Sequence, residues 1–160
     1  MDEKIITATL KESAGRVFAD LVQMDISPLK VSQDKAPLTE EHLTAMVGFT
    51  GVYMGIAAIH CTMNMARKIA GSMLMTDPSG FSAEEIRDGL GEVANQLSGR
   101  FKSQFAINMD LGDVVFDQTV PSVISGDNFE AQAVTDAKSY YYDFETEHGS
   151  FTVEVALKKM

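Results

Sequence analysis

The sequence predicts an α+β fold, with long helices packed on one face of a largely antiparallel sheet. Apolar residues recur at helical spacing in three segments, and alternating β-branched and aromatic residues form two hairpin-like pairs of strands. Helices that are segregated from hairpins are typical of antiparallel α+β layers. No linker divides the chain, so residues 1–160 are expected to form a single domain. The helical segments are 3–23, 63–74 and 82–105, and the hairpins span 44–62 and 140–157.

The first part of the chain is predicted to form a helix, a short strand and a hairpin. Residues 3–23 have the pattern of an amphipathic helix, because apolar residues between Ile6 and Leu21 return at helical spacing. Residues 29–32 alternate well enough for a short strand. Within 44–62, apolar residues alternate on both sides of Thr50-Gly51, which predicts two strands joined near that point.

The second part is predicted to form two helices followed by strands. The helix at 63–74 is stopped by the turn-forming residues 77–80. The next helix opens at Ser82, which has the spacing of a capping box with Glu85. The clearest hairpin of the chain closes near His148-Gly149. The strand candidates after the long helix are 114–116, 121–124, 129–134, 140–145 and 150–157.

The long helix carries a narrow polar stripe. At about 100° per residue, Asp88, Glu92, Asn95 and Gly99 fall within an arc of about 60°, opposite the apolar residues of the same helix. A solvated helix face is the ordinary explanation of such a stripe. A functional surface is the alternative.

Glycine favours the functional explanation. Gly89, Gly91 and Gly99 lie within the helix, and each costs about 1 kcal/mol relative to alanine. Such a cost is expected where a surface is kept low for a close-fitting partner. Tight packing between helices would explain the glycines equally well.

The pattern Glu92-x-x-Asn95 also has a recognisable position in the chain. It follows strands that contain Gly51-Val52-Tyr53-Met54-Gly55 and precedes Pro121-Ser122-Val123-Ile124-Ser125-Gly126. In these features the chain resembles the CheX-type chemotaxis phosphatases of the wider CheC/CheX/FliY family. The similarity covers nearly the whole chain and rests on the position of the motif with its glycine and proline landmarks, since E-x-x-N alone is common.

The resemblance implies a phosphatase that hydrolyses the phosphoaspartate of a CheY-type response regulator in chemotaxis. Asn95 would enter the phosphorylated site and hold the attacking water, because a carboxamide donates one hydrogen bond and accepts another. No covalent intermediate is expected, since no activated nucleophile is visible. Glu92 would pair with the regulator's active-site lysine. Mg²⁺ is expected on the regulator, and no cofactor of the chain's own is expected.

The same resemblance implies how partners dock. Asp88, Gly91 and Gly99 are expected to shape the surface that receives the regulator. A homodimer is also implied, and the hairpin at 140–157 offers an edge that could pair across subunits.

An echo of the motif lies in the first helix. Leu10-Lys11-Glu12-Ser13-Ala14-Gly15 aligns with Leu90-Gly91-Glu92-Val93-Ala94-Asn95, with three identities over six residues. Two-site members of the resembled family carry E-x-x-N in both helices, whereas here Gly15 stands where the amide would be. Glu12 is therefore expected to be non-catalytic. Whether the echo is a true repeat or a coincidence stays open.

Composition limits the partners and the compartment. A formal net charge of −10 argues against nucleic acid and anionic membranes, because both select lysine and arginine. No apolar run approaches the roughly 18 residues of a membrane-spanning helix, and residues 1–13 lack the apolar region of a signal peptide. The single cysteine, Cys61, has apolar neighbours and is expected to be buried and inert. A cytoplasmic protein is predicted.

Other site types fit less well. Residues 89–94 match a dinucleotide fingerprint by letter, but they lie within a helical period. His42, His60 and His148 are far apart and have no ligand-spaced partners, so zinc is not expected and His60 is interpreted as structural.

Two functions stay open beside the phosphatase. One is a non-catalytic docking module for a response regulator or a flagellar switch component, and the other is an acidic structural protein whose E-x-x-N is accidental.

Overall fold

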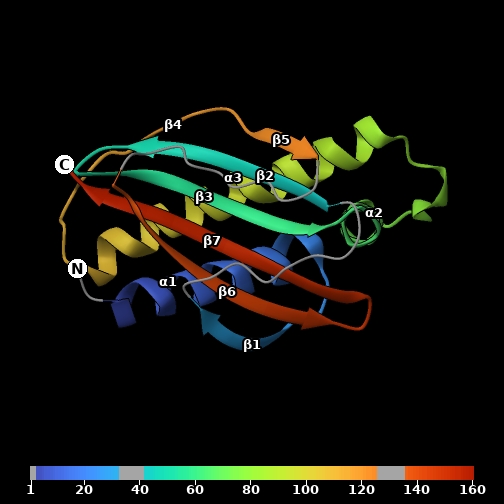
Figure 1. The fold of residues 1–160 in the computed structure, drawn as a ribbon, viewed down its shortest axis with the longest axis horizontal. Coiled ribbons are helices and arrows are strands. Elements are labelled where there is room, and N and C mark those ends of the chain that lie inside the picture. Colours follow the sequence, from blue (N-terminus) through green and yellow to red (C-terminus); the bar gives the residue numbers. More distant parts are fainter. Residues whose placement is uncertain (1–2, 33–41, 126–135) are drawn as a thin grey trace.

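Seven strands pair into one antiparallel sheet in the computed structural model, which describes residues 3–32, 42–125 and 136–160 (Figure 1). The strands are β1 (Ser27–Ser32), β2 (His42–Thr50), β3 (Tyr53–Thr62), β4 (Asp117–Gln118), β5 (Ser122–Ser125), β6 (Lys138–Thr146) and β7 (Gly149–Lys159). The helices are α1 (Glu3–Val17), the π-helical turn η1 (Phe18–Val22), α2 (Met63–Leu74), the 3₁₀ turn η2 (Pro78–Gly80) and α3 (Ala83–Asn108). The strand order is β1-β6-β7-β3-β2-β4, and β5 pairs with β2 beside β4. Figure 1 shows α1 and α3 across one face of the sheet, so the predicted fold class is confirmed.

Local sequence signals begin and end the helices. Ser82 and Glu85 exchange side-chain to backbone hydrogen bonds of 3.1 Å each, so the predicted capping box forms at the start of α3. Thr62 caps α2 by accepting from a backbone N–H of its first turn. The helix α1 continues into η1 and ends at Gln23, whose φ is 59°. Across the described ranges, none of the helices has an apolar stretch suited to crossing a membrane.

Aromatic side chains hold the helices on the sheet. Phe18 stacks on Phe151 with ring centroids 4.5 Å apart, and Phe151 stacks on Phe144 at 5.3 Å. Phe101 of α3 packs on Phe49 of β2 at 6.4 Å. All five are fully buried, and each such side chain stabilises the fold by about 1.5–3 kcal/mol. Because the apolar face of α3 is fixed in this way, its polar stripe faces away from the sheet.

His60 has the structural role that the sequence suggests. Its side chain is buried on β3, with Nδ1 2.8 Å from Thr44 Oγ1 and Nε2 2.7 Å from Glu154 Oε1. Ser139 donates to the other oxygen of Glu154 at 2.9 Å. Buried polar groups are tolerated where each has a partner. This network ties β2, β3, β6 and β7 together.

The C-terminal third differs from the prediction in two places. Residues 114–116 do not form a strand, because Phe116 turns its ring edge-on to Phe49 at 5.8 Å and pairing with β2 starts only at Asp117. The hairpin at 140–157 is confirmed as β6 and β7, but β6 pairs with β1 and β7 pairs with β3. Along residues 141–145 the outer side of this hairpin is therefore already paired with β1 and is not open to a second subunit. The strand predicted at 129–134 lies outside the described residues.

Candidate functional site

The polar stripe of α3 is accessible. Glu92 and Asp88 are exposed and Asn95 is half-buried, whereas Leu90 and Val93 on the other side of the helix are buried. Burial of Glu92 or Asn95 would have excluded the mechanism that the resemblance implies. The site instead presents a carboxylate and a carboxamide to a partner at the same time, about one helical turn apart.

Asn95 is held by a residue from another part of the chain. Gln118 of β4 donates its Nε2–H to Asn95 Oδ1 at 2.6 Å, and Nε2 also lies 3.3 Å from the backbone oxygen of Asn95. Within the described part of the chain, the Asn95 Nδ2 has no acceptor. The oxygen end of the carboxamide is therefore anchored, and its NH₂ end bonds to none of the described residues.

Among the described residues, Glu92 is bonded to one neutral neighbour. Its Oε1 accepts a hydrogen bond of 3.1 Å from Gln96 Nε2, one turn further along α3. Among residues 3–32, 42–125 and 136–160, no lysine, arginine or histidine forms an ion pair with it. An exposed carboxylate without a counter-ion favours contact with a cationic group on a partner.

The predicted docking residues Asp88 and Gly99 lie at an open surface. Asp88 is exposed one turn before Glu92. A Cβ placed on Gly99 would meet nothing within 4 Å, so packing within the chain does not require a glycine there. The docking role of Gly99 stays a prediction, and its position leaves the surface there low.

The glycines earlier in α3 have a different explanation. Gly91 is buried, and a Cβ on it would lie 3.5 Å from both Pro121 and Val123. A Cβ on Gly89 would lie 3.2 Å from Cβ of Ala70 on α2. Tight packing against α2 accounts for Gly89, whereas a Cβ at Gly91 would make only ordinary van der Waals contact. Because Gly91 is buried, its predicted docking role gains no support from its position.

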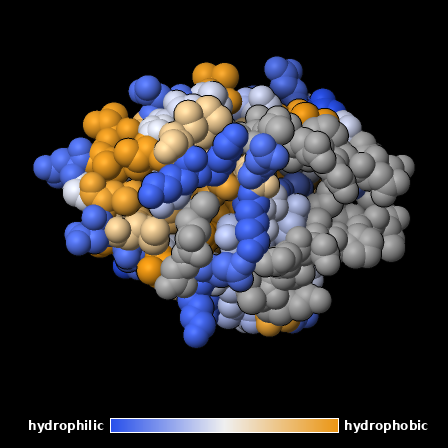
Figure 2. All heavy atoms as spheres, turned by 60° about the vertical axis from the view of Figure 1, so that its left-hand side comes forward, coloured by the Kyte–Doolittle hydropathy of each residue, from blue (hydrophilic) through white to orange (hydrophobic). Residues whose placement is uncertain are grey.

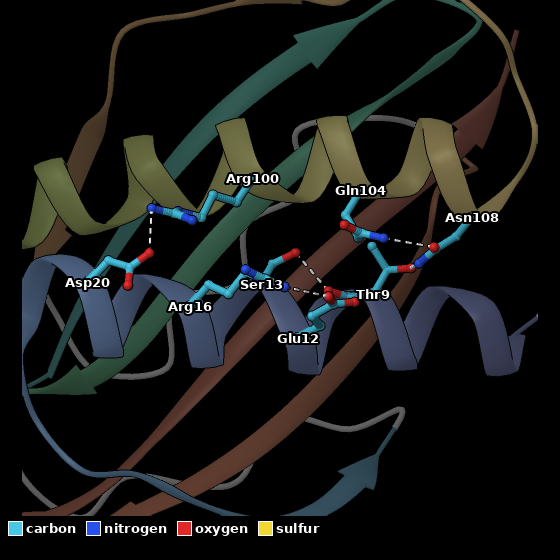
Figure 3. Close-up of polar contacts among 8 residues, drawn as sticks. All are labelled: Thr9, Glu12, Ser13, Arg16, Asp20, Arg100, Gln104 and Asn108. Atoms are coloured by element: carbon cyan, nitrogen blue, oxygen red, sulfur yellow. Dashed lines mark hydrogen bonds and ion pairs between the residues drawn. The ribbon is translucent and has the colours of Figure 1, made fainter.

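Polar side chains of α1 and η1 meet those of α3 along a seam between the helices (Figure 3). Arg100 Nη2 pairs with Asp20 Oδ2 at 2.9 Å, and Asn108 donates its Nδ2–H to Thr9 Oγ1 at 2.8 Å. These contacts fix the two helices against each other. A groove of about 540 Å³ runs along the seam, lined by Glu12, Ser13 and Arg16 from α1 and by Gln96, Gly99, Arg100, Ser103 and Gln104 from α3.

The segment after α3 flanks the site and is partly apolar. Val115 and Val120 are 80% and 81% exposed on either side of Gln118. Figure 2 turns the end of the molecule that contains the C-terminus toward the viewer and shows apolar residues gathered there. Lys102 lies two turns after Asn95, and its partial burial lowers its pKa, an effect that the Asp117 carboxylate opposes. A partner on Asn95 thus meets apolar side chains beside charged ones.

This arrangement can position a molecule, and the cysteine thiol of the chain is not available to it as a nucleophile. The one cysteine, Cys61, is fully buried, and burial raises its pKa to about 12, so the thiolate is not formed near neutral pH. Among the described residues, no three histidine, cysteine, aspartate or glutamate side chains lie close enough together to hold a metal ion. A carboxamide next to a carboxylate suits the orientation of a water and the recognition of a cation.

Comparison with known families decides the classification. Residues 43–145 match the family described as "Chemotaxis phosphatase CheX", which is more than half of the chain. The chain belongs to the CheX family. No curated protein sequence matches it.

Solved structures of this family and its relatives share the fold of the CheX-family chain. A chemotaxis protein CheX from Desulfovibrio desulfuricans is 27% identical with a TM-score of 0.76, covering 96% of this chain and 99% of that one. A CheC-like superfamily protein from Shewanella is 23% identical with a TM-score of 0.78, covering 99% of both chains. A CheX from Borrelia burgdorferi, solved in complex with CheY, BeF₃ and Mg²⁺, is 17% identical with a TM-score of 0.71, covering 95% of this chain and 97% of that one.

Sequence reasoning missed one residue of this CheX-family site. Gln118 lies in a segment with no helical or strand period, and 22 residues separate it from Asn95. The only available signal was indirect, since Phe116 and Val123 mark a chain that returns to the sheet. Contact with Asn95 depends on the path of that return, which residue spacing does not specify.

Proposed function

We propose that this CheX-family chain is a phosphatase that hydrolyses the phosphoaspartate of a CheY-type response regulator. The observation that carries the proposal is the joint accessibility of Glu92 and Asn95 on α3, with the Asn95 NH₂ group left for an external acceptor. The Borrelia burgdorferi CheX in complex with CheY and Mg²⁺ supports a regulator as the partner and as the holder of the metal.

Asn95 supplies the water-positioning group in this proposal. Its carboxamide enters the regulator's site, accepts a hydrogen bond from a water and donates one toward the phosphoryl oxygens. The water oxygen bonds to phosphorus while the bond from phosphorus to the aspartyl oxygen breaks, giving inorganic phosphate and a free carboxylate. Phosphoryl transfer depends mainly on such positioning and on charge stabilisation, which Mg²⁺ on the regulator supplies.

Glu92 sets the register between the two proteins. Its carboxylate has no counter-ion in the described chain and pairs with the regulator's active-site lysine. Asp88 and the open surface at Gly99 lie on the same stripe and border the docking area. The exposed Val120 adds an apolar contact next to them.

The test is the decay of a phosphorylated CheY-type regulator from the same cell, measured alone, with the wild-type chain and with Asn95→Ala. Affinity is measured in parallel by titration with the regulator held in its BeF₃-bound form, which does not turn over. The wild type is expected to accelerate decay, and the variant to bind with the same affinity but lose about 100-fold in kcat, as misplacement of a reacting group does.

Two other outcomes separate the remaining functions. If the wild type and Asn95→Ala both bind and neither changes the decay rate, the chain is a docking module. If no regulator binds, the E-x-x-N pattern is accidental and the chain is an acidic structural protein.

The proposal includes a cytoplasmic homodimer. Because β6 and β7 are paired on both sides, a dimer formed by strand pairing would use β1 or the edge made by β4 and β5. Sedimentation equilibrium measures the mass in solution, and a monomeric mass at micromolar concentration would contradict this part of the proposal.

A further inference from the structure

We infer that Gln118 is a positioning residue that presents the Asn95 carboxamide to the reaction. The hydrogen bond of 2.6 Å from Gln118 Nε2 to Asn95 Oδ1 is the observation that carries this inference. It rests on the proposed function, since it assigns to Gln118 a part in the water-positioning step. The motif E-x-x-N thereby acquires a third member from β4.

An isolated asparagine side chain would not hold one orientation. The terminal torsion of asparagine is broad and roughly two-fold, so the oxygen and the NH₂ of the amide exchange places at little cost. A donor fixed on one side removes this freedom, because only the oxygen can accept its hydrogen. Gln118 thus turns the Asn95 NH₂ toward the partner and leaves the second lone pair of Oδ1 for a water.

Gln118 is itself held by the sheet. It pairs in register with Phe49, and the next residue, Thr119, is tied to Gly48 by two hydrogen bonds of 2.9 Å, one donated by each backbone N–H. β4 is therefore a rigid support for the carboxamide. A hydrogen bond to Oδ1 also polarises the Asn95 amide and strengthens its NH₂ as a donor.

Gly51 allows the support to approach this closely. A Cβ on Gly51 would lie 2.7 Å from Phe116 Cδ1 and 2.9 Å from the backbone oxygen of Val115. Only a glycine at position 51 lets the segment of Val115 and Phe116 lie this close to the turn between β2 and β3. The path from Val115 to Gln118 is thereby fixed by a residue that is remote from the chemistry.

Two substitutions test the inference. Gln118→Met keeps the length of the side chain without a donor, and we expect kcat to fall about tenfold, the loss that one hydrogen bond accounts for. Gln118→Glu keeps the shape but can only accept, so it draws the Asn95 NH₂ inward and is expected to lower kcat further. The KM for the phosphorylated regulator and the affinity for its BeF₃-bound form stay unchanged in the methionine variant, because Gln118 acts through Asn95.

A matched control is available on α3. Gln104 donates to Asn108 Oδ1 at 2.9 Å, so it forms the same kind of carboxamide pair without Asn95. Gln104→Met is expected to leave kcat and KM at wild-type values. A double-mutant cycle completes the set, since Gln118→Met should have no further effect on kcat in an Asn95→Ala background.

The outcomes separate this inference from the proposed function. If Asn95→Ala slows turnover and Gln118→Met does not, the positioning role is overturned and the phosphatase stands. If Asn95→Ala has no effect on turnover, both are overturned.

A second measurement is independent of turnover. It is the rate at which the side-chain NH₂ hydrogens of Gln118 exchange with solvent in the free protein, which is expected to be slower than that of an exposed glutamine. Exchange as fast as that of an exposed amide means that the bond to Asn95 is not kept in solution and overturns the inference.

Discussion

The helices α1 and α3 lie side by side on the sheet and carry related patterns, yet only α3 presents a carboxylate with an amide. On α1, Glu12 pairs with Arg16 at 3.4 Å, and the position of the amide is Gly15. On α3, Glu92 accepts from the neutral Gln96 and from no other described residue, and Asn95 is anchored by Gln118. The two helices thus share a scaffold and differ in the groups that would meet a partner.

The difference indicates what the proposed function requires of a helix beyond the E-x-x-N motif. α3 lies next to β2, where β4 supplies a carboxamide from outside the helix, whereas the strand neighbours of α1 are β6 and β7. The carboxylate of α1 is also neutralised by a cation on its own helix, so it has less attraction for a partner's lysine. The proposed function of α3 therefore uses a second element, β4, for which the described residues offer α1 no equivalent.

The largest effect is expected from removing this second element through Gly51→Ala. The added Cβ conflicts with the backbone oxygen of Val115 at 2.9 Å, so the segment that leads to Gln118 must move. We expect kcat to fall at least tenfold with little change in KM, and the free energy of unfolding to fall by about 1–3 kcal/mol, as overpacking does. Regulator decay and thermal unfolding measure the two effects.

Gly80→Ala is the control for this substitution. A Cβ on Gly80 meets nothing within 4 Å, so both stability and kcat should be retained. Full activity in Gly51→Ala would mean that Asn95 does not need the support of β4, and α3 would then differ from α1 in its amide and in the pairing of its carboxylate alone.

The comparison also separates what the sequence could predict from what it could not. Periodicity located α1, α2 and α3, because each buries one apolar stripe, and the capping box of Ser82 and Glu85 marked the start of α3. The exposure of Glu92 could be predicted as well, because Glu92 lies on the side of α3 opposite its apolar stripe. Residues 114–116 were wrongly predicted as a strand, because their apolar character serves the contact of Phe116 with Phe49 rather than a strand pair.

The neighbours of the α3 glycines and the contact of Gln118 could not be predicted from the sequence, for the same reason. The cost of a glycine in a helix is visible in the sequence, but whether its neighbour is a partner protein or the same chain depends on three-dimensional packing. Gly91 faces Val123 and Gly99 faces open space, although both belong to one helix. Gln118 likewise acquires its role only when β4 pairs with β2 beside α3.

An intermediate effect is expected from removing the carboxylates one at a time. Glu92→Gln deletes the charge that meets the regulator's lysine, so we expect KM to rise about tenfold with kcat little changed, the loss of one charge-assisted hydrogen bond. Glu12→Gln is the matched control on α1 and should leave KM unchanged, since its charge is already paired with Arg16. Steady-state decay at low ionic strength measures both, and equal effects on KM would show that the regulator contacts α1 as closely as α3.

The smallest effect is expected from giving α1 the missing amide. Gly15→Asn completes E-x-x-N on that helix, and a Cβ there meets nothing within 4 Å, so the variant should fold and gain about 0.3 kcal/mol from better helix propensity. We expect its regulator decay to stay within twofold of wild type, because α1 has no counterpart of Gln118 among the described residues and Glu12 stays paired with Arg16. The measurement is best made in an Asn95→Ala background, where any activity must come from α1. Recovery of a tenth or more of wild-type kcat would mean that the motif suffices without support from a strand, and Gln118 would lose the role that distinguishes α3.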